Sequence, residues 1–153
     1  DDEVALLEQF QRDPNTESER IRLYEYMSRE MLLALVRGAK ATLFPSLYEG
    51  FGLPALEAMA LSTATLAANR GALPEVVGEA ALTVDPTDIK AMSAAIRTLD
   101  ADDDLRGDLE RQGVLRAGLF SMSNYQARLK DLYARSGSVS ELKPCAEPSS
   151  RHH

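Results

Sequence analysis

The feature that most constrains the fold is an alternation of short apolar runs with stretches of helical periodicity. Four runs predict strands, at residues 21–26, 41–46, 64–68 and 81–85, and helical patterns lie between them. Strands that alternate with helices form a parallel sheet, because each connection must cross a face of the sheet to reach the next strand. The sequence therefore predicts an α/β fold, a Rossmann-like parallel sheet of about four strands flanked by helices.

Helical signals surround these strands. A helix is predicted at residues 3–10, another behind a Ser28 cap, another from about Pro54, and a short one in "ALPEVVG". After Pro86 the strand signals stop, and amphipathic patterns predict a helical C-terminus. Its three helices are expected around residues 89–99, 103–119 and 125–133.

The length and composition fit one domain. The chain has 153 residues, 44% of them hydrophobic, which is enough for one core. Residues 1–136 are assigned to this domain, which is expected to be partial. Residues 137–153, rich in Gly, Ser and Pro at their start, are predicted to be a disordered tail. His152 and His153 are either a tag remnant, which we favour, or native residues. Because the predicted sheet begins with a helix and has few strands, we expect a part of a longer protein.

Charge and cysteine usage exclude several classes of partner and compartment. The formal net charge is -7, so no basic surface exists to attract nucleic acid. The single Cys145 cannot form an internal disulfide, which fits a reducing compartment. No signal peptide and no apolar run of about 20 residues is present. We therefore expect a cytoplasmic protein, with peripheral attachment to the inner face of the membrane left open.

The stretch "PSLYEGFGLPALEAMA", residues 45–60, predicts a ligand site. It joins the carboxyl end of a strand to the amino end of a helix, where open α/β sheets bind ligands. Gly50 and Gly52 allow a close approach to the backbone, and Pro54 suits a first helical turn. The free N–H groups of residues 51–55 and the helix dipole favour a phosphate at this turn.

Two carboxylates flank the turn. Glu57 lies one turn into the helix, and its side chain leans back toward the N-terminus, where its oxygens can accept both hydroxyls of a ribose. Glu49 precedes the turn and suits the hydroxyls of a sugar. The spacing indicates a sugar nucleotide. The alternative is that Glu57 serves only the helix dipole, a contribution of about 0.3–1 kcal/mol, and that the turn binds nothing.

A family resemblance strengthens the ligand interpretation. "FPSLYEGFGLPALEAMA", followed by "LAANRGALPEVVGEAALTVDP", resembles the donor-binding half of retaining GT-B glycosyltransferases of the family 4 type, also called glycosyl transferases group 1. Glu49 and Glu57 match the two glutamates of that family's E-x7-E pattern. The resemblance runs from about Arg22 to Tyr133, where "FSMSNYQARLKDLY" is similar to the family's closing helix. It covers most of this chain and the last half or less of a family member.

The resemblance implies a role for each site residue. Glu49 would contact the transferred sugar as the catalytic residue, Glu57 would hold the ribose, and Arg70, Gly71 and "LPEVVG" would line the back of the pocket. The backbone that meets sugar and diphosphate would belong to Gly50, Phe51, Gly52 and Leu53. The implied enzyme is a hexosyl or mannosyl transferase of polysaccharide biosynthesis. It uses a nucleoside-diphosphate sugar, and we expect no metal and no other cofactor.

The resemblance also implies partners outside this chain. An N-terminal acceptor domain of the same protein would hold a saccharide or lipid-linked acceptor, and basic residues from the first strand and helix of the donor domain would clamp the diphosphate. In this family the sugar is thought to react on its front face, with Glu49 stabilising positive charge at the sugar. Because both regions and any catalytic His are missing here, we expect the isolated chain to be inactive. The alternative function is a non-catalytic interaction or regulatory module that reuses the half-domain fold.

The chain departs from the family at two places. Ser62-Thr63-Ala64 stands where Gly-Thr-Pro is usual, which affects the turn after the Glu-bearing helix. Met122 stands where an aromatic residue is usual, and a packing change is expected there.

Three further features are predicted to be structural. "DADDD", residues 100–104, contains the Asp-x-Asp of a different, metal-dependent glycosyltransferase architecture, but it joins two predicted helices and is expected to cap them. Tyr125 and Tyr133 are expected in the core rather than on a substrate platform. Phe51 either packs under its loop, which we favour, or borders the sugar.

Overall fold

The computed structural model describes residues 22, 24 and 26–136. The chain divides into two compact units, Asp1–Leu35 and Val36–His153, and each is treated by itself below. The helix expected over residues 3–10 and the tail expected from residue 137 lie outside the described residues.

The helix predicted behind Ser28 is α2 (Arg29–Gly38), which crosses the boundary between the units. The Ser28 hydroxyl accepts a hydrogen bond from the Met31 N–H at 3.3 Å, so the predicted cap is confirmed. The strand predicted just before it, at residues 21–26, falls partly outside the described residues. Its described members, Arg22, Tyr24 and Tyr26, belong to no strand.

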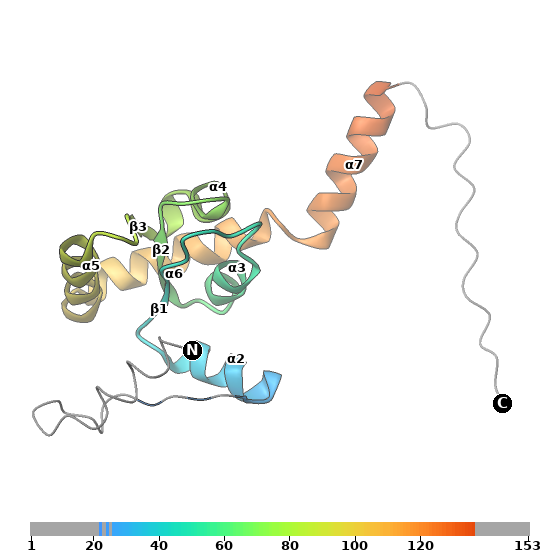
Figure 1. Ribbon diagram of the computed structural model, residues 1–153. Coiled ribbons are helices and arrows are strands. Elements are labelled where there is room, and N and C mark those ends of the chain that lie inside the picture. Colours follow the sequence, from blue (N-terminus) through green and yellow to red (C-terminus); the bar gives the residue numbers. More distant parts are fainter. Residues whose placement is uncertain (1–21, 23, 25, 137–153) are drawn as a thin grey trace, which may run out of the picture. The chain divides into compact units, whose positions relative to one another are not determined.

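The second unit is built on a parallel sheet. Its strands are β1 (Ala41–Phe44), β2 (Ala64–Ala68) and β3 (Leu82–Val84), in the order β1-β2-β3 (Figure 1). Both ladders are parallel. Every residue of β2 is buried, which explains why its sequence is a continuous run of small and apolar residues rather than an alternating one. Three strands, rather than the four expected, therefore lie in the described part of the chain.

Helices cover the sheet in two clusters of buried side chains. Ala67 of β2 packs with α3 (Leu53–Ala60) and α4 (Leu73–Val77), whereas its neighbour Leu66 packs with α5 (Ile89–Ala101) and α6 (Asp103–Gly118). Successive residues of a strand point to opposite faces, so Leu66 and Ala67 pack into different clusters. α6 joins the two clusters, because its Leu109 belongs to the second and its Ala117 packs against the first. A short 3-10 turn, η2 (Gly78–Ala80), follows α4. The α/β fold predicted from the sequence is confirmed.

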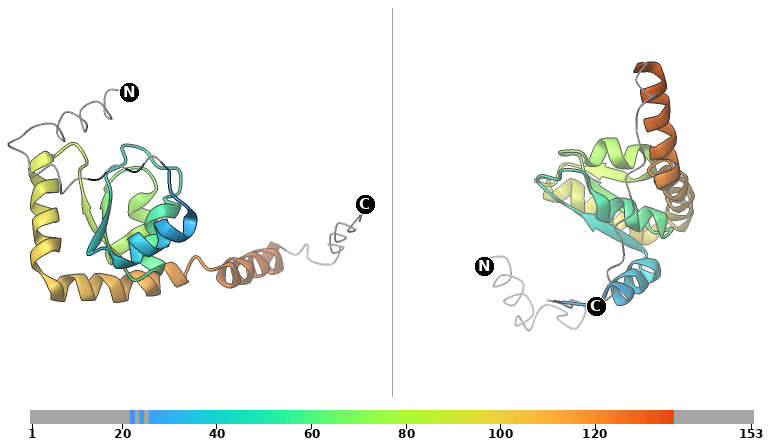
Figure 2. Two further views of the ribbon diagram at one scale, coloured as in Figure 1. Left: turned by 90° about the horizontal axis from the view of Figure 1, so that it is seen from below. Right: turned by 90° about the vertical axis from the view of Figure 1, so that its right-hand side faces the viewer.

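α6 packs closely against α3 and meets α5 at a sharp corner, as Figure 2 shows. Glycine favours this close packing, because a Cβ atom on Gly113 of α6 would lie 3.3 Å from the Cβ of Met59 in α3. Met59 is fully buried by this contact. The last helix, α7 (Met122–Ser136), follows α6 after a short turn.

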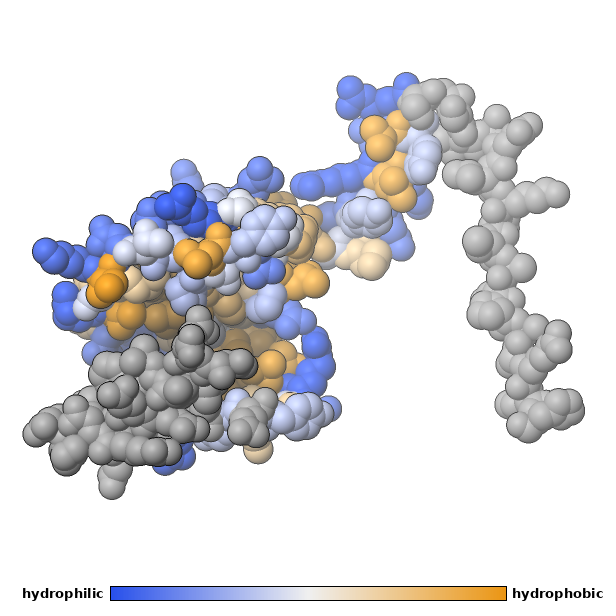
Figure 3. Space-filling model, viewed as in Figure 1, coloured by the Kyte–Doolittle hydropathy of each residue, from blue (hydrophilic) through white to orange (hydrophobic). Residues whose placement is uncertain are grey.

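The prediction that Tyr125 and Tyr133 lie in the core is wrong for the described residues. Their exposed fractions are 60% and 39%, and Leu132 on the same helix is 62% exposed. Figure 3 shows hydrophobic residues at the surface of α7. The physical reason is that the buried clusters on the sheet are formed with residues of α3 to α6 and include no residue of α7. No helix in the described residues has the length and apolar character that a membrane span requires.

Ser62, which stands where the family usually has a glycine, lies just after the end of α3. The Thr63 N–H donates to the Ala58 carbonyl at 3.1 Å and the Ser62 N–H donates to the Met59 carbonyl at 3.0 Å, the pattern of a Schellman motif. Ser62 has a φ of 60°, the left-handed conformation that glycine adopts without steric cost. The chain therefore keeps the turn that a glycine would make, at the cost of backbone strain.

We predict that Ser62→Gly raises the free energy of unfolding by about 0.5–1 kcal/mol. Removing the strained Cβ gains about 1–2 kcal/mol, and the larger entropy of an unfolded glycine offsets about half of it. Urea unfolding measures the difference. Ser62→Ala keeps the Cβ and is the matched control, which should gain nothing. Equal stability of the two variants would contradict the strain.

Candidate functional site

The Gly-rich turn connects β1 to α3. Gly52 is the N-cap of α3 in the left-handed conformation, with φ 89° and ψ 38°, and Pro54 stands in the first helical turn. Because Gly52 has no side chain to accept hydrogen bonds, the first N–H groups of α3 are left for another partner. The predicted position of the turn, at the carboxyl end of a parallel strand and the amino end of a helix, is confirmed.

The turn is held against the segment that precedes α4. The Ala72 N–H donates to the Glu49 carbonyl at 3.1 Å. A Cβ atom on Gly71 would lie 2.8 Å from the same carbonyl oxygen, and a Cβ on Gly52 would lie 2.7 Å from Cδ2 of Leu73. Both glycines are therefore needed for this close approach. The structure thus brings together two sequence segments, around Glu49 and around Gly71, that were predicted to line one pocket.

The predicted ligand-binding residues differ in exposure. Glu49 is half-buried in the turn, while Gly50 and Glu57 are exposed. The side chains of Phe51 and Leu53 are 43% and 60% exposed, respectively. The turn therefore presents backbone, a carboxylate on each side and two apolar side chains to its surroundings.

Phe51 has a partner that the sequence reasoning missed. Its ring meets the ring of Phe120 edge to face, with centroids 5.8 Å apart and an interplanar angle of 83°. Phe120 begins the "FSMS" motif, which runs from the turn after α6 into the first residues of α7, and no local pattern in the motif predicts its contact with the Gly-rich turn. Of the two interpretations of Phe51, packing is the one that this contact favours.

Arg70 does not point to an empty site but pairs with an acidic residue. Its Nη2 lies 2.8 Å from Oδ2 of Asp85, at the carboxyl ends of β2 and β3. Oδ1 of Asp85 also accepts hydrogen bonds from the Thr87 hydroxyl at 2.7 Å and the Thr87 N–H at 3.0 Å. These two hydrogen bonds, with a smaller contribution from the positive Arg70, hold the pKa of Asp85 below its ordinary value. Asp85 is the last residue of the strand predicted at residues 81–85 and directly follows the observed β3, and this place at a strand end is the signal that could have indicated it.

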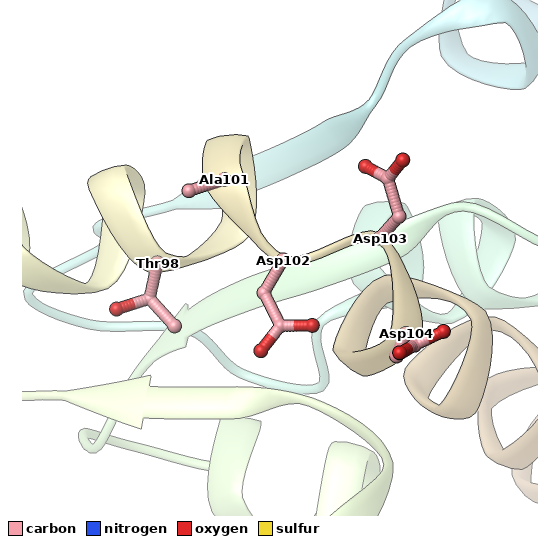
Figure 4. Close-up of a pocket in the computed structure, with 5 residues that line it drawn as sticks. All are labelled: Thr98, Ala101, Asp102, Asp103 and Asp104. Atoms are coloured by element: carbon pink, nitrogen blue, oxygen red, sulfur yellow. The ribbon is translucent and has the colours of Figure 1, made fainter.

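The aspartates of residues 100–104 serve the corner between α5 and α6. Asp102 is the N-cap of α6, and its Oδ1 accepts a hydrogen bond from the Leu105 N–H at 2.8 Å. Asp103 points away from Asp102 in Figure 4 and pairs with Arg106. Within the described residues, no group of three or more His, Cys, Asp or Glu side chains is placed to hold a metal ion. The predicted capping role is confirmed.

The chain is similar to known proteins in sequence and in structure. Residues 15–116 match the family described as Glycosyl transferases group 1. The chain is 40% identical over 113 residues to O-antigen chain mannosyltransferase B of Escherichia coli, a match that covers 74% of this chain and 30% of that protein. It is 42% identical over 115 residues to the MMP alpha-(1->4)-mannosyltransferase of Mycolicibacterium hassiacum, covering 71% of this chain and 28% of that protein.

A solved structure shows the same architecture. The sucrose-phosphate synthase from Thermosynechococcus elongatus is similar with a TM-score of 0.73 and 30% sequence identity, over 90% of this chain and 35% of that one. This similarity confirms the predicted GT-B type of α/β fold. The chain spans about a third of the length of each of these three proteins.

The cap at the corner predicts a stability difference between two variants. Asp102→Ala removes the acceptor of the Leu105 N–H and should lower the free energy of unfolding by about 1 kcal/mol. Asp102→Asn keeps a good capping acceptor and should change it little. Urea unfolding measures both. An Asn variant as unstable as the Ala variant would argue against capping.

The environment of Asp85 predicts a pH dependence. A carboxyl whose pKa is lowered in the folded chain stabilises the fold above the pKa of the unfolded chain, and this stabilisation is lost as the pH falls through the lowered folded pKa. Thr87→Val should raise the pKa of Asp85, measured by NMR titration of its carboxyl carbon. The stability that this variant loses should be largest near neutral pH and shrink in acid. Thr83→Val on the exposed side of β3 is the control, and equal titration curves for all three chains would exclude the Thr87 contribution.

Proposed function

The chain belongs to the glycosyl transferases group 1 family, and from this premise we propose that it is the donor-binding part of a retaining glycosyltransferase of the family 4 type. Residues 1–136 would form part of the C-terminal domain of the GT-B fold and bind a nucleoside-diphosphate sugar. The observation that carries the proposal is the uncapped N-terminus of α3 at the carboxyl end of β1, with Glu49 and Glu57 on either side.

The diphosphate would lie at the N-terminus of α3. Gly52 leaves the first N–H groups of the helix without a side-chain acceptor, and the helix dipole favours a negative charge there. The backbone of residues 50–53 would approach the sugar and the diphosphate. Phosphate binding of this kind needs no metal ion, and we propose that basic residues from a preceding strand and helix complete the clamp.

Glu57 would select the nucleoside. It is exposed on α3 one turn from Gly52, and a helical side chain leans toward the N-terminus of its helix. Its two carboxylate oxygens match the two hydroxyls of a ribose, since an ionised carboxylate accepts hydrogen bonds only. The ribose would then lie beside a diphosphate bound at the same helix end.

Glu49 would act on the sugar. Its backbone is fixed by the Ala72 N–H and by the close approach of Gly71, so its carboxylate starts from a rigid position. In a reaction on the front face of the sugar, the leaving phosphate takes the acceptor proton, and Glu49 stabilises the positive charge that develops at the sugar. Arg70, held by its ion pair with Asp85, would line the back of the pocket.

Transfer would require more than this chain. Holding an acceptor against the reacting carbon supplies up to about 7–11 kcal/mol of barrier reduction, and we propose that an N-terminal domain of the same protein does so for a saccharide or lipid-linked acceptor. A hexosyl or mannosyl donor is the class we favour, because the two relatives described above are named mannosyltransferases. Those names also disfavour the alternative of a non-catalytic module.

The test of the proposal is Glu57→Gln. Losing a charge-assisted hydrogen bond to the ribose costs about 1.5–3 kcal/mol, so the donor dissociation constant should rise about tenfold or more. Calorimetric titration with UDP-glucose, GDP-mannose and ADP-glucose measures the affinity of the unmodified chain and of the variant. Glu79→Gln, at an exposed glutamate of η2, is the matched control and should bind as the unmodified chain does. Unchanged affinity in the Glu57 variant would count against the ribose role.

A further inference from the structure

Arg116 of α6 is bound to the end of α4. Its Nε donates to the Val76 carbonyl at 2.9 Å, and its Nη2 donates to the Glu75 carbonyl. These carbonyls belong to the last turn of α4, where the helix dipole favours a positive charge. Gly78 leaves room for the guanidinium, because a Cβ atom there would lie 3.3 Å from its Cζ. One side chain therefore fixes α6 to the C-terminal end of α4.

The same guanidinium is linked to the Gly-rich turn indirectly, by way of the rings of Phe120 and Phe51. Cζ of Arg116 lies 5.4 Å from the centroid of the Phe120 ring, within the range of a cation-π interaction. Phe120 in turn meets Phe51 edge to face. A residue of α6 thus contacts the turn indirectly, with each step made by a directional interaction.

The opposite end of α4 contacts the turn directly. Leu73 lies against Gly52, and the Ala72 N–H donates a hydrogen bond to the Glu49 carbonyl. The turn is therefore joined to both ends of α4, directly at the N-terminal end and through Phe120 and Arg116 at the C-terminal end. The contacts therefore form a closed ring that includes both Phe51 and Arg116.

We propose that Arg116 is a positioning residue for the donor site, an inference that rests on the function proposed above. By holding Phe120 against Phe51, it orients the backbone N–H groups of the turn toward the diphosphate. Arg116 acts through other residues and takes no part in the chemistry. Lysine would not reproduce this arrangement, because the Nε and Nη2 donors of arginine are held at a fixed spacing in one plane, whereas lysine is a point charge on a flexible stem.

A double-mutant cycle separates this role from general stabilisation. Arg116→Met should weaken binding of the tightest of UDP-glucose, GDP-mannose and ADP-glucose by roughly fivefold, measured by calorimetry. In a Phe51→Leu chain, which has lost the ring that Phe120 contacts, the same substitution should have no further effect. Arg111→Met is the matched control: Arg111 lies on the same helix, is exposed and pairs with Asp108, and its loss should leave affinity unchanged.

A second measurement needs no ligand. In nitrogen-15 NMR spectra of the free chain, Arg116→Met should shift or broaden the amide signals of Gly50 and Gly52, and Arg111→Met should not. Phe120→Leu keeps the bonds of Arg116 to α4 but breaks the link to Phe51, so it should give the same changes. This variant preserves the test if Arg116→Met does not fold.

The outcomes are distinct. Non-additive losses of affinity together with altered glycine signals support the positioning role. Additive losses, or glycine signals that stay in place in both the Arg116 and the Phe120 variants, overturn it. If the unmodified chain binds none of the three nucleotide sugars, the proposed function fails, while the glycine signals still decide whether Arg116 orders the turn.

Discussion

The structure depends on the burial of β2. All five of its residues are inaccessible to solvent, so its backbone N–H and C=O groups can be satisfied only by neighbouring strands. β1 and β3 supply those partners in parallel ladders. Because parallel strands all end at the same edge of the sheet, the segments that follow them meet there. Glu49 after β1, Arg70 after β2 and Asp85 after β3 come from distant parts of the sequence and lie along this one edge.

At this edge, close backbone contacts hold the Gly-rich turn against the segment before α4. Gly71 and Gly52 let the segment before α4 approach the turn to distances that no side chain would permit. The turn gains rigidity without covering its outer surface, where Phe51 and Leu53 remain 43% and 60% exposed. A rigid backbone with free N–H groups suits anion binding, since donors that are already oriented lose little entropy when a ligand arrives. The same geometry therefore serves both packing and the proposed donor site.

Charged residues near the two ends of the strands have different roles. At the amino-terminal side, Asp102 caps a helix, and Lys40 pairs with Asp100 at 2.7 Å. At the carboxyl side, Arg70 and Asp85 pair beside the Gly-rich turn. Composition alone makes the first group more conspicuous, with three consecutive aspartates. Position in the fold instead favours Arg70 and Asp85 as site residues, because ligands of open α/β sheets bind at the carboxyl ends of the strands.

The sequence by itself determined the order of elements, three of the strands and the place of the turn. These follow from local signals: apolar period, Pro45 after β1, Pro54 in the first turn of α3, and Asp102 before α6. Only the tertiary structure decided the rest. The periodicity that predicted α7 could not say whether its apolar face would find a partner, and Tyr125 proved exposed. The contacts of Phe51 with Phe120, of Arg116 with Val76, and of Arg70 with Asp85 join residues 69, 40 and 15 positions apart. No local pattern encodes such pairs, because they exist only once the sheet has brought the carboxyl ends of its strands together.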